Sequence, residues 1–143
     1  MIKIIAGGKK NAGEYAALIS EYEKRLRKPY EIEWVFMPEE KLDKFLGDWP
    51  FSGREMVICC DERGKNISSD EYSLCLEKAF LDSREVVILI GGAYGFSDLV
   101  RSRADLVWSF SRLVFPHQLF RVMVVEQIYR ASQIAMGRPY HHE

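Results

Sequence analysis

The sequence predicts an α/β domain in which helices cover both faces of a mostly parallel sheet of about five strands. Short runs rich in Ile and Val alternate along the chain with longer segments that carry apolar residues at helical spacing. Residues 55–61 and 85–92 contain almost continuous apolar stretches, as expected of strands that are buried on both faces. With 143 residues, 48% of them hydrophobic, we expect one domain over residues 1–143.

In the first half, each expected element follows from a local pattern. Residues 2–8 form a short β-type run that is closed by two glycines, which indicates a strand ending in a turn. Residues 12–28 place apolar side chains at helical intervals and stop before Pro29, so we expect a helix there. The segments that follow are expected to be a strand, a partly helical connection and a buried strand: 31–37, 38–53 and 55–61.

The second half repeats the alternation. Residues 68–83 begin with Ser and Asp at capping positions and are expected to form a helix. The final helix is expected from Gln118 to about Met136, because Gly137 and Pro139 then end it. Between them we expect a buried strand, a short helix and a last strand: 85–92, 97–104 and 105–111.

The charge of the chain is unevenly distributed. A net charge of −1 argues against a protein that coats nucleic acid electrostatically. From Ser97 onward, however, six arginines stand against four acidic residues, which gives +2 there and −3 before it. Arginine suits planar or phosphate partners, although a solvated helix face with paired charges remains an alternative.

Membrane and metal partners are not expected. No stretch approaches the roughly 20 apolar residues that cross a bilayer, and the first apolar run is too short for a secretory signal, so we expect a cytoplasmic protein. Cys59, Cys60 and Cys75 lack the C-x-x-C spacing of a zinc site and are expected to be buried thiols.

A glycine-rich turn, "LIGGAYGFSD", follows the buried strand at 85–92. It matches neither the dinucleotide fingerprint G-x-G-x-x-G nor the P-loop. Its glycines, Gly91, Gly92 and Gly95, would let a ligand approach the main chain at the carboxyl edge of the sheet. The alternative is a tight strand-to-helix turn that requires glycine only for its backbone geometry.

Three more segments accompany this turn: "DERGKNISSDEY", "LVFPHQLFRVMVVEQIYRA" and the terminal "PYHHE". Together they resemble the SPOUT class of methyltransferases, and more closely the bacterial ribosomal large-subunit RNA methyltransferase H family, which methylates N3 of pseudouridine. The resemblance spans the whole chain, and the last two segments are its most specific part.

The resemblance implies a C-terminal trefoil knot, S-adenosylmethionine bound within that knot, and an obligate antiparallel homodimer. It also implies that the substrate is 23S rRNA, within the large subunit or the assembled ribosome. By position, the cofactor contacts would fall mostly on backbone, at Cys60, Gly92, Ser111, Arg112, Leu113, Val114, Phe115 and Pro116.

The implied reaction removes a proton from N3, so a general base would be useful. His141 is the first candidate, Glu126 the second and His117 the third. The alternatives are that His117 caps the final helix and that Glu126 only forms an i,i+4 ion pair with Arg130. For the C-terminal residues the alternative is fraying of the chain end.

The other implied roles concern charge and stacking. Arg121 and Arg130 could hold phosphate or stabilise charge on the carbonyl oxygens of the base, and Tyr140 could stack on a flipped base. The resulting sets are catalytic His141, Tyr140, Glu126 and Arg121, and substrate-binding Arg130, His117 and His142.

This chain departs from the family pattern at two positions. Gln118 replaces a proline after His117, which would loosen the start of the helix. His142 replaces an arginine of the family's tail, so phosphate binding there should weaken and depend on pH.

Two other classes of function are alternatives. A hydrolase would use Cys60 or Ser111 with a histidine, but the sequence contains no G-x-S-x-G motif. A non-enzymatic RNA- or ribosome-binding module would keep the arginines without needing a cofactor pocket, so cofactor binding separates it from the methyltransferase.

Overall fold

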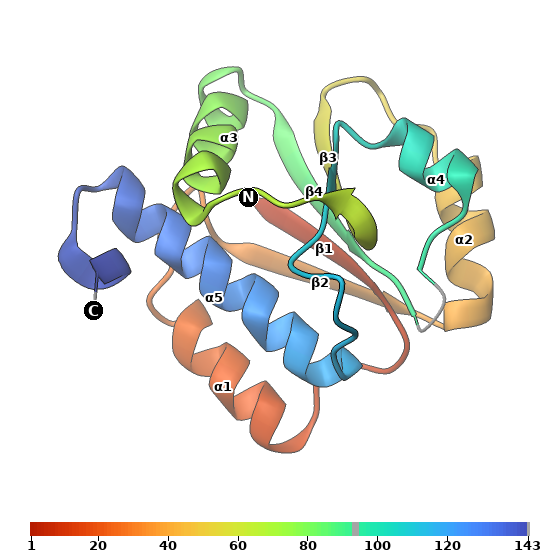
Figure 1. Cartoon of the computed structure of the whole chain (residues 1–143), viewed down its shortest axis with the longest axis horizontal. Helices are drawn as coiled ribbons and strands as arrows, with labels where there is room; N and C mark the ends of the chain where they lie inside the picture. Colours follow the sequence, from red (N-terminus) through yellow and green to blue (C-terminus); the bar gives the residue numbers. More distant parts are fainter. Residues whose placement is uncertain (93–94, 143) are drawn as a thin grey trace.

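The computed structural model describes residues 1–92 and 95–142, without the side chain of His142 (Figure 1). Strands and helices alternate along most of the chain, as the sequence predicts. The elements are β1 (Ile2–Gly7), α1 (Gly13–Glu23), β2 (Ile32–Met37), α2 (Glu39–Asp48), β3 (Glu55–Lys65), α3 (Ser69–Leu81), β4 (Glu85–Ile90), α4 (Asp98–Arg103), β5 (Leu106–Trp108), α5 (His117–Ala135) and the 3-10 helix η1 (Pro139–His142).

The strands form one five-stranded sheet in the order β2-β1-β4-β3-β5, and every neighbouring pair is parallel. The predicted α/β class with a parallel sheet of about five strands is therefore confirmed. Because all strands point the same way, their carboxyl ends meet along one edge. Ligand sites of open α/β sheets lie at this edge.

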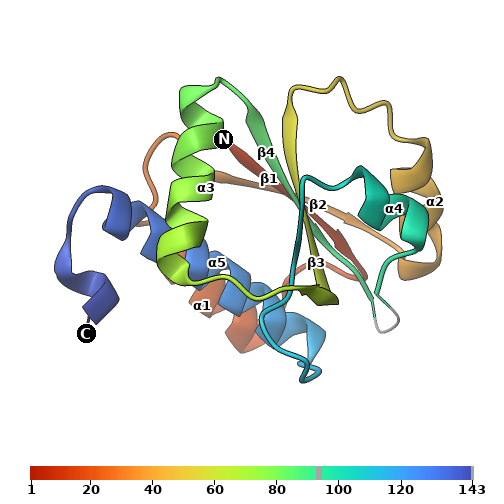
Figure 2. The same ribbon diagram turned by 45° about the horizontal axis from the view of Figure 1, so that its top comes forward.

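Helices cover both faces of the sheet, as predicted. Figures 1 and 2 show α1, α3 and α5 on one face and α2 and α4 on the other. Successive strand residues point to opposite faces, so in β1 the side chain of Ile4 packs under the first helix group and Ile5 under the second. Both side chains are fully buried.

The first helix is shorter than predicted, because α1 ends at Glu23 and not near residue 28. The N–H groups of Arg25 and Leu26 bond to the carbonyls of Tyr22 and Glu23, three residues back, which tightens the chain into a turn. This turn buries the side chain of Leu26 against the core. The helical spacing of apolar residues continues to Leu26, so it predicted a longer helix than the structure has.

The bounds of β3 and β5 also differ from the prediction. β3 continues to Lys65, four residues beyond the expected end, while β5 covers only Leu106–Trp108 of the expected 105–111. Cys60 and Lys65 both pair with Trp108, so the residues between them form a bulge. Residues 61–65 are mostly polar, so the apolar pattern did not predict that the strand continues through them beyond the core.

Gly64 lies in this bulge, where the backbone of β5 comes very close. A Cβ atom on Gly64 would lie 2.3 Å from the carbonyl oxygen of Val107. No side chain fits there unless the two strands separate.

We therefore predict that Gly64→Ala lowers the free energy of unfolding by about 3 kcal/mol, because backbone has to move to accept the methyl group. The matched control is Gly47→Ala, whose Cβ would meet only the end of the Leu99 side chain, at 3.3 Å. Urea denaturation should show the control within about 1 kcal/mol of the wild type. Equal stability of the two variants would contradict the assigned strand pairing.

Candidate cofactor cavity and C-terminal cluster

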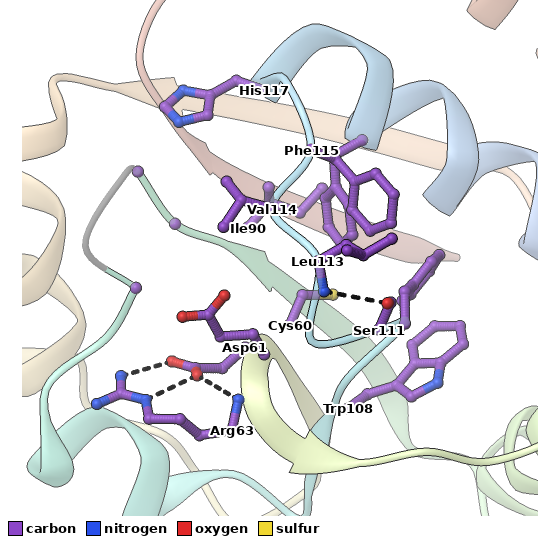
Figure 3. Close-up of a pocket in the computed structure, with 16 residues that line it drawn as sticks. Cys60, Asp61, Arg63, Ile90, Trp108, Ser111, Leu113, Val114, Phe115 and His117 are labelled. Carbon is purple, nitrogen blue, oxygen red and sulfur yellow. Dashed lines mark hydrogen bonds and ion pairs between the residues drawn. The ribbon is translucent and has the colours of Figure 1, made fainter.

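A cavity of about 380 Å³ lies at the carboxyl ends of β3, β4 and β5 (Figure 3). We call it the edge cavity. One wall is the end of β3 from Cys60 to Arg63, a second is formed by Gly91, Gly92 and Gly95, and a third is the loop before α5. Its volume lies in the range of small-molecule sites.

Most of the residues predicted to hold a cofactor line this cavity. They are Cys60, Gly92, Ser111, Leu113, Val114 and Phe115. Two others do not: Arg112 lines an adjoining cavity of about 590 Å³, and Pro116 is the N-cap residue of α5. The glycine turn and the loop before α5, far apart in sequence, thus come together at one site.

The loop before α5 presents apolar side chains at the cavity. Leu113 and Val114 are 70% and 81% exposed, respectively. The hydroxyl of Ser111 accepts a hydrogen bond from the N–H of Leu113 at 3.1 Å, which fixes a local turn. Adjacent large aliphatic side chains at this exposure form a surface that a ligand or a second protein would cover.

The floor of the cavity carries a buried carboxylate that the sequence analysis missed. The side chain of Asp61 is 1% exposed and forms a two-pronged ion pair with Arg63, at 2.9 and 2.8 Å. The N–H of Phe96 also donates to Asp61, and Arg63 donates to the carbonyl of Phe96. Burial alone would raise the pKa of Asp61, but these hydrogen bonds outweigh it and lower the pKa to about 2.

This ion pair ties the end of β3 to the chain that follows the glycine turn. The signal in the sequence was an acidic residue directly after the apolar run of a buried strand, at the edge where ligand sites form.

A second missed carboxylate, Glu39, lies against the glycine turn from the start of α2. A Cβ on Gly92 would lie 2.6 Å from the carboxyl carbon of Glu39, so the space beside this glycine is occupied by that side chain. Glu39 Oε1 lies 3.1 Å from Nδ1 of His117. His117 also lines the edge cavity, while Pro116 occupies the N-cap position without a side-chain cap. His117 therefore contacts α2 and the cavity and does not cap α5.

The remaining predicted residues gather at the other end of α5. Glu126 Oε1 accepts hydrogen bonds from Nε of Arg130 at 2.9 Å and from the hydroxyl of Tyr140 at 3.2 Å. The guanidinium of Arg130 also lies over the Tyr140 ring, 4.9 Å from its centroid. Burial, reinforced by Tyr22 and by the charge of Glu126, raises the pKa of Tyr140, so the phenol stays protonated.

His141 joins this group. Its Nδ1 lies 3.2 Å from Nη1 of Arg130, and its Nε2 lies 3.3 Å from Oδ2 of Asp70 at the start of α3. We call Glu126, Arg130, Tyr140, His141 and Asp70 the tail cluster. Sequence reasoning missed Asp70, because only tertiary packing brings α3 to the chain end. The side chain of His142 lies outside the described residues.

Arg121 belongs to neither group. It is 1% exposed, and its guanidinium donates to the carbonyl oxygens of Lys9 at 2.6 Å and Gly7 at 2.8 Å. Burial lowers the pKa of Arg121 and the charge of Glu39 opposes this, so the group remains a cation. These contacts hold the loop after β1 onto α5, and the predicted catalytic role of Arg121 stays a prediction.

The edge cavity and the tail cluster are separated along α5. His117 opens the helix and Arg130 follows 13 residues later (130 − 117), a rise of about 20 Å. Figure 1 shows η1 next to the C-terminal end of α5, far from His117 at its start. Within one chain, the two groups of predicted site residues therefore cannot meet on one small substrate.

Two other kinds of feature are absent from the described residues. Among residues 1–92 and 95–142, no helix is both long enough and apolar enough to cross a membrane. In the same ranges, no three His, Cys, Asp or Glu side chains are arranged to hold a metal ion.

Comparison with known proteins gives a consistent result. Residues 1–141 match the family described as "Predicted SPOUT methyltransferase". The chain is 37% identical over 153 residues to the ribosomal RNA large subunit methyltransferase H of Caldicellulosiruptor bescii, with 99% of each chain covered. Proteins of the same name from Clostridium botulinum (strain Langeland) and Desulfitobacterium hafniense (strain DCB-2) are 37% and 38% identical over 156 residues, with 98% of each chain covered.

The Asp61 ion pair should make the stability of the protein depend on pH. The pKa of about 2 in the folded protein is below the ordinary value, so this group stabilises the fold above about pH 4. That contribution, about 2 kcal/mol, is lost as the pH falls towards 2. Chemical denaturation should show that Asp61→Asn is less stable than wild type at pH 7 and that the difference shrinks in acid.

The control for this experiment is Glu62→Gln, the exposed neighbour on the same strand. Its stability should follow that of the wild type at every pH. A deficit of Asp61→Asn that stays constant from pH 7 to pH 2 would contradict the ionised state assigned to Asp61.

Proposed function

The chain belongs to the SPOUT methyltransferase family, and from that premise we propose that it transfers a methyl group from S-adenosylmethionine to N3 of a pseudouridine in 23S rRNA of the large subunit. Relatives that cover almost the whole chain carry the name ribosomal RNA large subunit methyltransferase H, which supports an rRNA substrate. The cofactor and the N3 specificity come from the resemblance in the sequence. We propose residues 1–143 as a single domain of this type, working in the cytoplasm, where ribosomes are found.

The observation that carries the proposal is the edge cavity. Its size, its apolar wall at Leu113, Val114 and Phe115, and the backbone of the glycine turn suit an adenosyl group, which combines a flat ring with polar edges. Main-chain groups at Gly91 and Gly92 would bind the polar edges. When bound, S-adenosylmethionine would supply a methyl group activated by a positively charged sulfur.

The tail cluster would act on the substrate. Arg130 offers a guanidinium that suits phosphate, and Tyr140 offers an aromatic ring that stays uncharged. His142 would add a weaker, pH-dependent contact to phosphate. Residue type alone gives three candidates for the proton acceptor, which are His141, Glu126 and His117 in that order.

A homodimer would join the two groups of residues. Because α5 holds them about 20 Å apart in one chain, we propose that the tail of one subunit reaches the edge cavity of the other. The exposed side chains of Leu113 and Val114 provide apolar surface for such a contact. The trefoil knot that the resemblance implies remains part of this proposal.

A non-enzymatic RNA-binding module is the second candidate. It would use the arginines of the C-terminal half, but it would not need a cavity lined by six of the eight residues predicted for the cofactor. The cavity therefore favours the enzyme.

The test of the function is methyl transfer. We predict that the purified protein transfers tritiated methyl from S-adenosylmethionine to 23S rRNA in ribosomes from a strain that lacks the gene. Ribosomes from the wild-type strain, already methylated, serve as the control and should take up little label. A protein that binds these ribosomes but transfers no methyl to either sample would fit the binding module and contradict the enzyme.

The shared site predicts the result of removing the tail. Deletion of residues 140–143 should leave folding, dimerisation by light scattering and cofactor affinity by calorimetry nearly unchanged, while methyl transfer stops. The companion variant is Gly92→Val, in which the new side chain would meet the carboxylate of Glu39 and deform the cavity wall. It should remain folded but lose cofactor binding.

Mixing the two inactive variants gives the sharper test. Random exchange makes about half of the dimers mixed, and each mixed dimer combines one intact cavity with one intact tail, so about a quarter of sites should recover. Exchange is verified with differently tagged subunits. If exchange occurs and activity stays at zero, the tail does not serve the partner's cavity.

A further inference from the structure

The two described imidazoles of this chain are held in opposite tautomers. A carboxylate oxygen only accepts hydrogen bonds at neutral pH, so the contact of 3.1 Å between Glu39 Oε1 and His117 requires a proton on Nδ1. In the neutral ring the lone pair then lies on Nε2. His117 lines the edge cavity at the start of α5, and Figure 3 shows its ring on the side of the glycine turn.

His141 has the reverse arrangement. A guanidinium only donates, so the contact of 3.2 Å between Arg130 Nη1 and His141 requires the lone pair on Nδ1. The proton then lies on Nε2, towards Asp70 Oδ2 at 3.3 Å. The lone pair of His141 thus points at the Arg130 guanidinium and not at an open cavity.

We propose that His117, and not His141, is the general base of the methyl transfer, and that Glu39 is its positioning residue. This inference rests on the proposed function. Nε2 of His117 takes the proton that the ring nitrogen of the nucleotide loses. The electron pair left on that nitrogen forms the bond to the methyl carbon, and the pair of the broken carbon–sulfur bond stays on sulfur.

The charges around His117 suit this role. Glu39 stabilises the imidazolium once the proton has arrived, as the carboxylate of a catalytic triad does. The other charged side chains on the edge cavity are Asp61, Glu62 and Arg63 of β3, and Asp61 is already paired with Arg63.

Glu39 has two further neighbours, although its side chain is 41% exposed. Its carboxylate lies beside the backbone of Gly92, where a Cβ would come within 2.6 Å. The buried cation Arg121 also attracts it. The carboxylate therefore contacts the glycine turn and the first residue of α5 at once.

The first test needs no activity. Long-range proton–nitrogen NMR of the imidazoles, at a pH where the rings are neutral, reports the tautomer of each histidine, with signals assigned through His117→Gln and His141→Gln. We expect the Nδ1–H form for His117 and the Nε2–H form for His141. An Nε2–H form at His117 would overturn the inference.

The second test separates base catalysis from binding. At saturating cofactor, His117→Gln should lower the rate of methyl transfer about 100-fold or more, while its cofactor affinity by calorimetry stays within about threefold of wild type. The rate of the wild type should rise with pH as the base loses its proton, and this acid limb should be absent from His117→Gln. Glu39→Gln, which removes the carboxylate that orients the ring, should lower the rate at saturating cofactor while cofactor affinity stays within about threefold of wild type.

Glu40→Gln, the exposed neighbour on α2, is the matched control and should behave as wild type. If His117→Gln keeps its rate and its acid limb, or if its defect disappears at saturating cofactor, the assignment is wrong. If the acid limb disappears in His141→Gln instead, His141 and not His117 is the general base. A wild type without methyl transfer would refute the proposed function itself, whereas active wild type with normal His117→Gln refutes only this inference.

Discussion

The parallel arrangement of β3, β4 and β5 is the constraint on which the site depends. Parallel strands bring their carboxyl ends to one edge, so three loops from separate parts of the chain meet there. Gly64 lets β5 approach β3 closely, and the ion pair of Asp61 with Arg63 then ties β3 to the chain after the glycine turn. The edge cavity is the space that these contacts leave open.

The long helix α5 imposes a second constraint. It starts at the edge cavity with His117 and carries Glu126 and Arg130 to the opposite end, where the tail folds back on them. A rigid helix cannot shorten this separation. A site that needs both groups must therefore use two chains, which explains why a short domain would depend on a partner for its chemistry.

The sequence predicted the sheet, its burial and the alternation of helices, because these depend on local apolar patterns. Most of the residues that the family resemblance implied for the cofactor lie on the cavity wall, including Cys60 and Gly92. It did not lead to Glu39, Asp61 or Asp70, since each acts through a tertiary contact with a residue far along the chain. Patterns of spacing contain no information on such contacts.

We propose that the edge cavity holds the cofactor and that the partner's tail closes over it. A crystal structure of residues 1–143 with S-adenosylmethionine tests both proposals at once. We expect adenosyl density between the glycine turn and the loop at 109–116, with Tyr140 of the other subunit facing the methyl group. Density outside this cavity, or a partner tail that lies away from the cavity in a catalytically active crystal, would contradict these proposals.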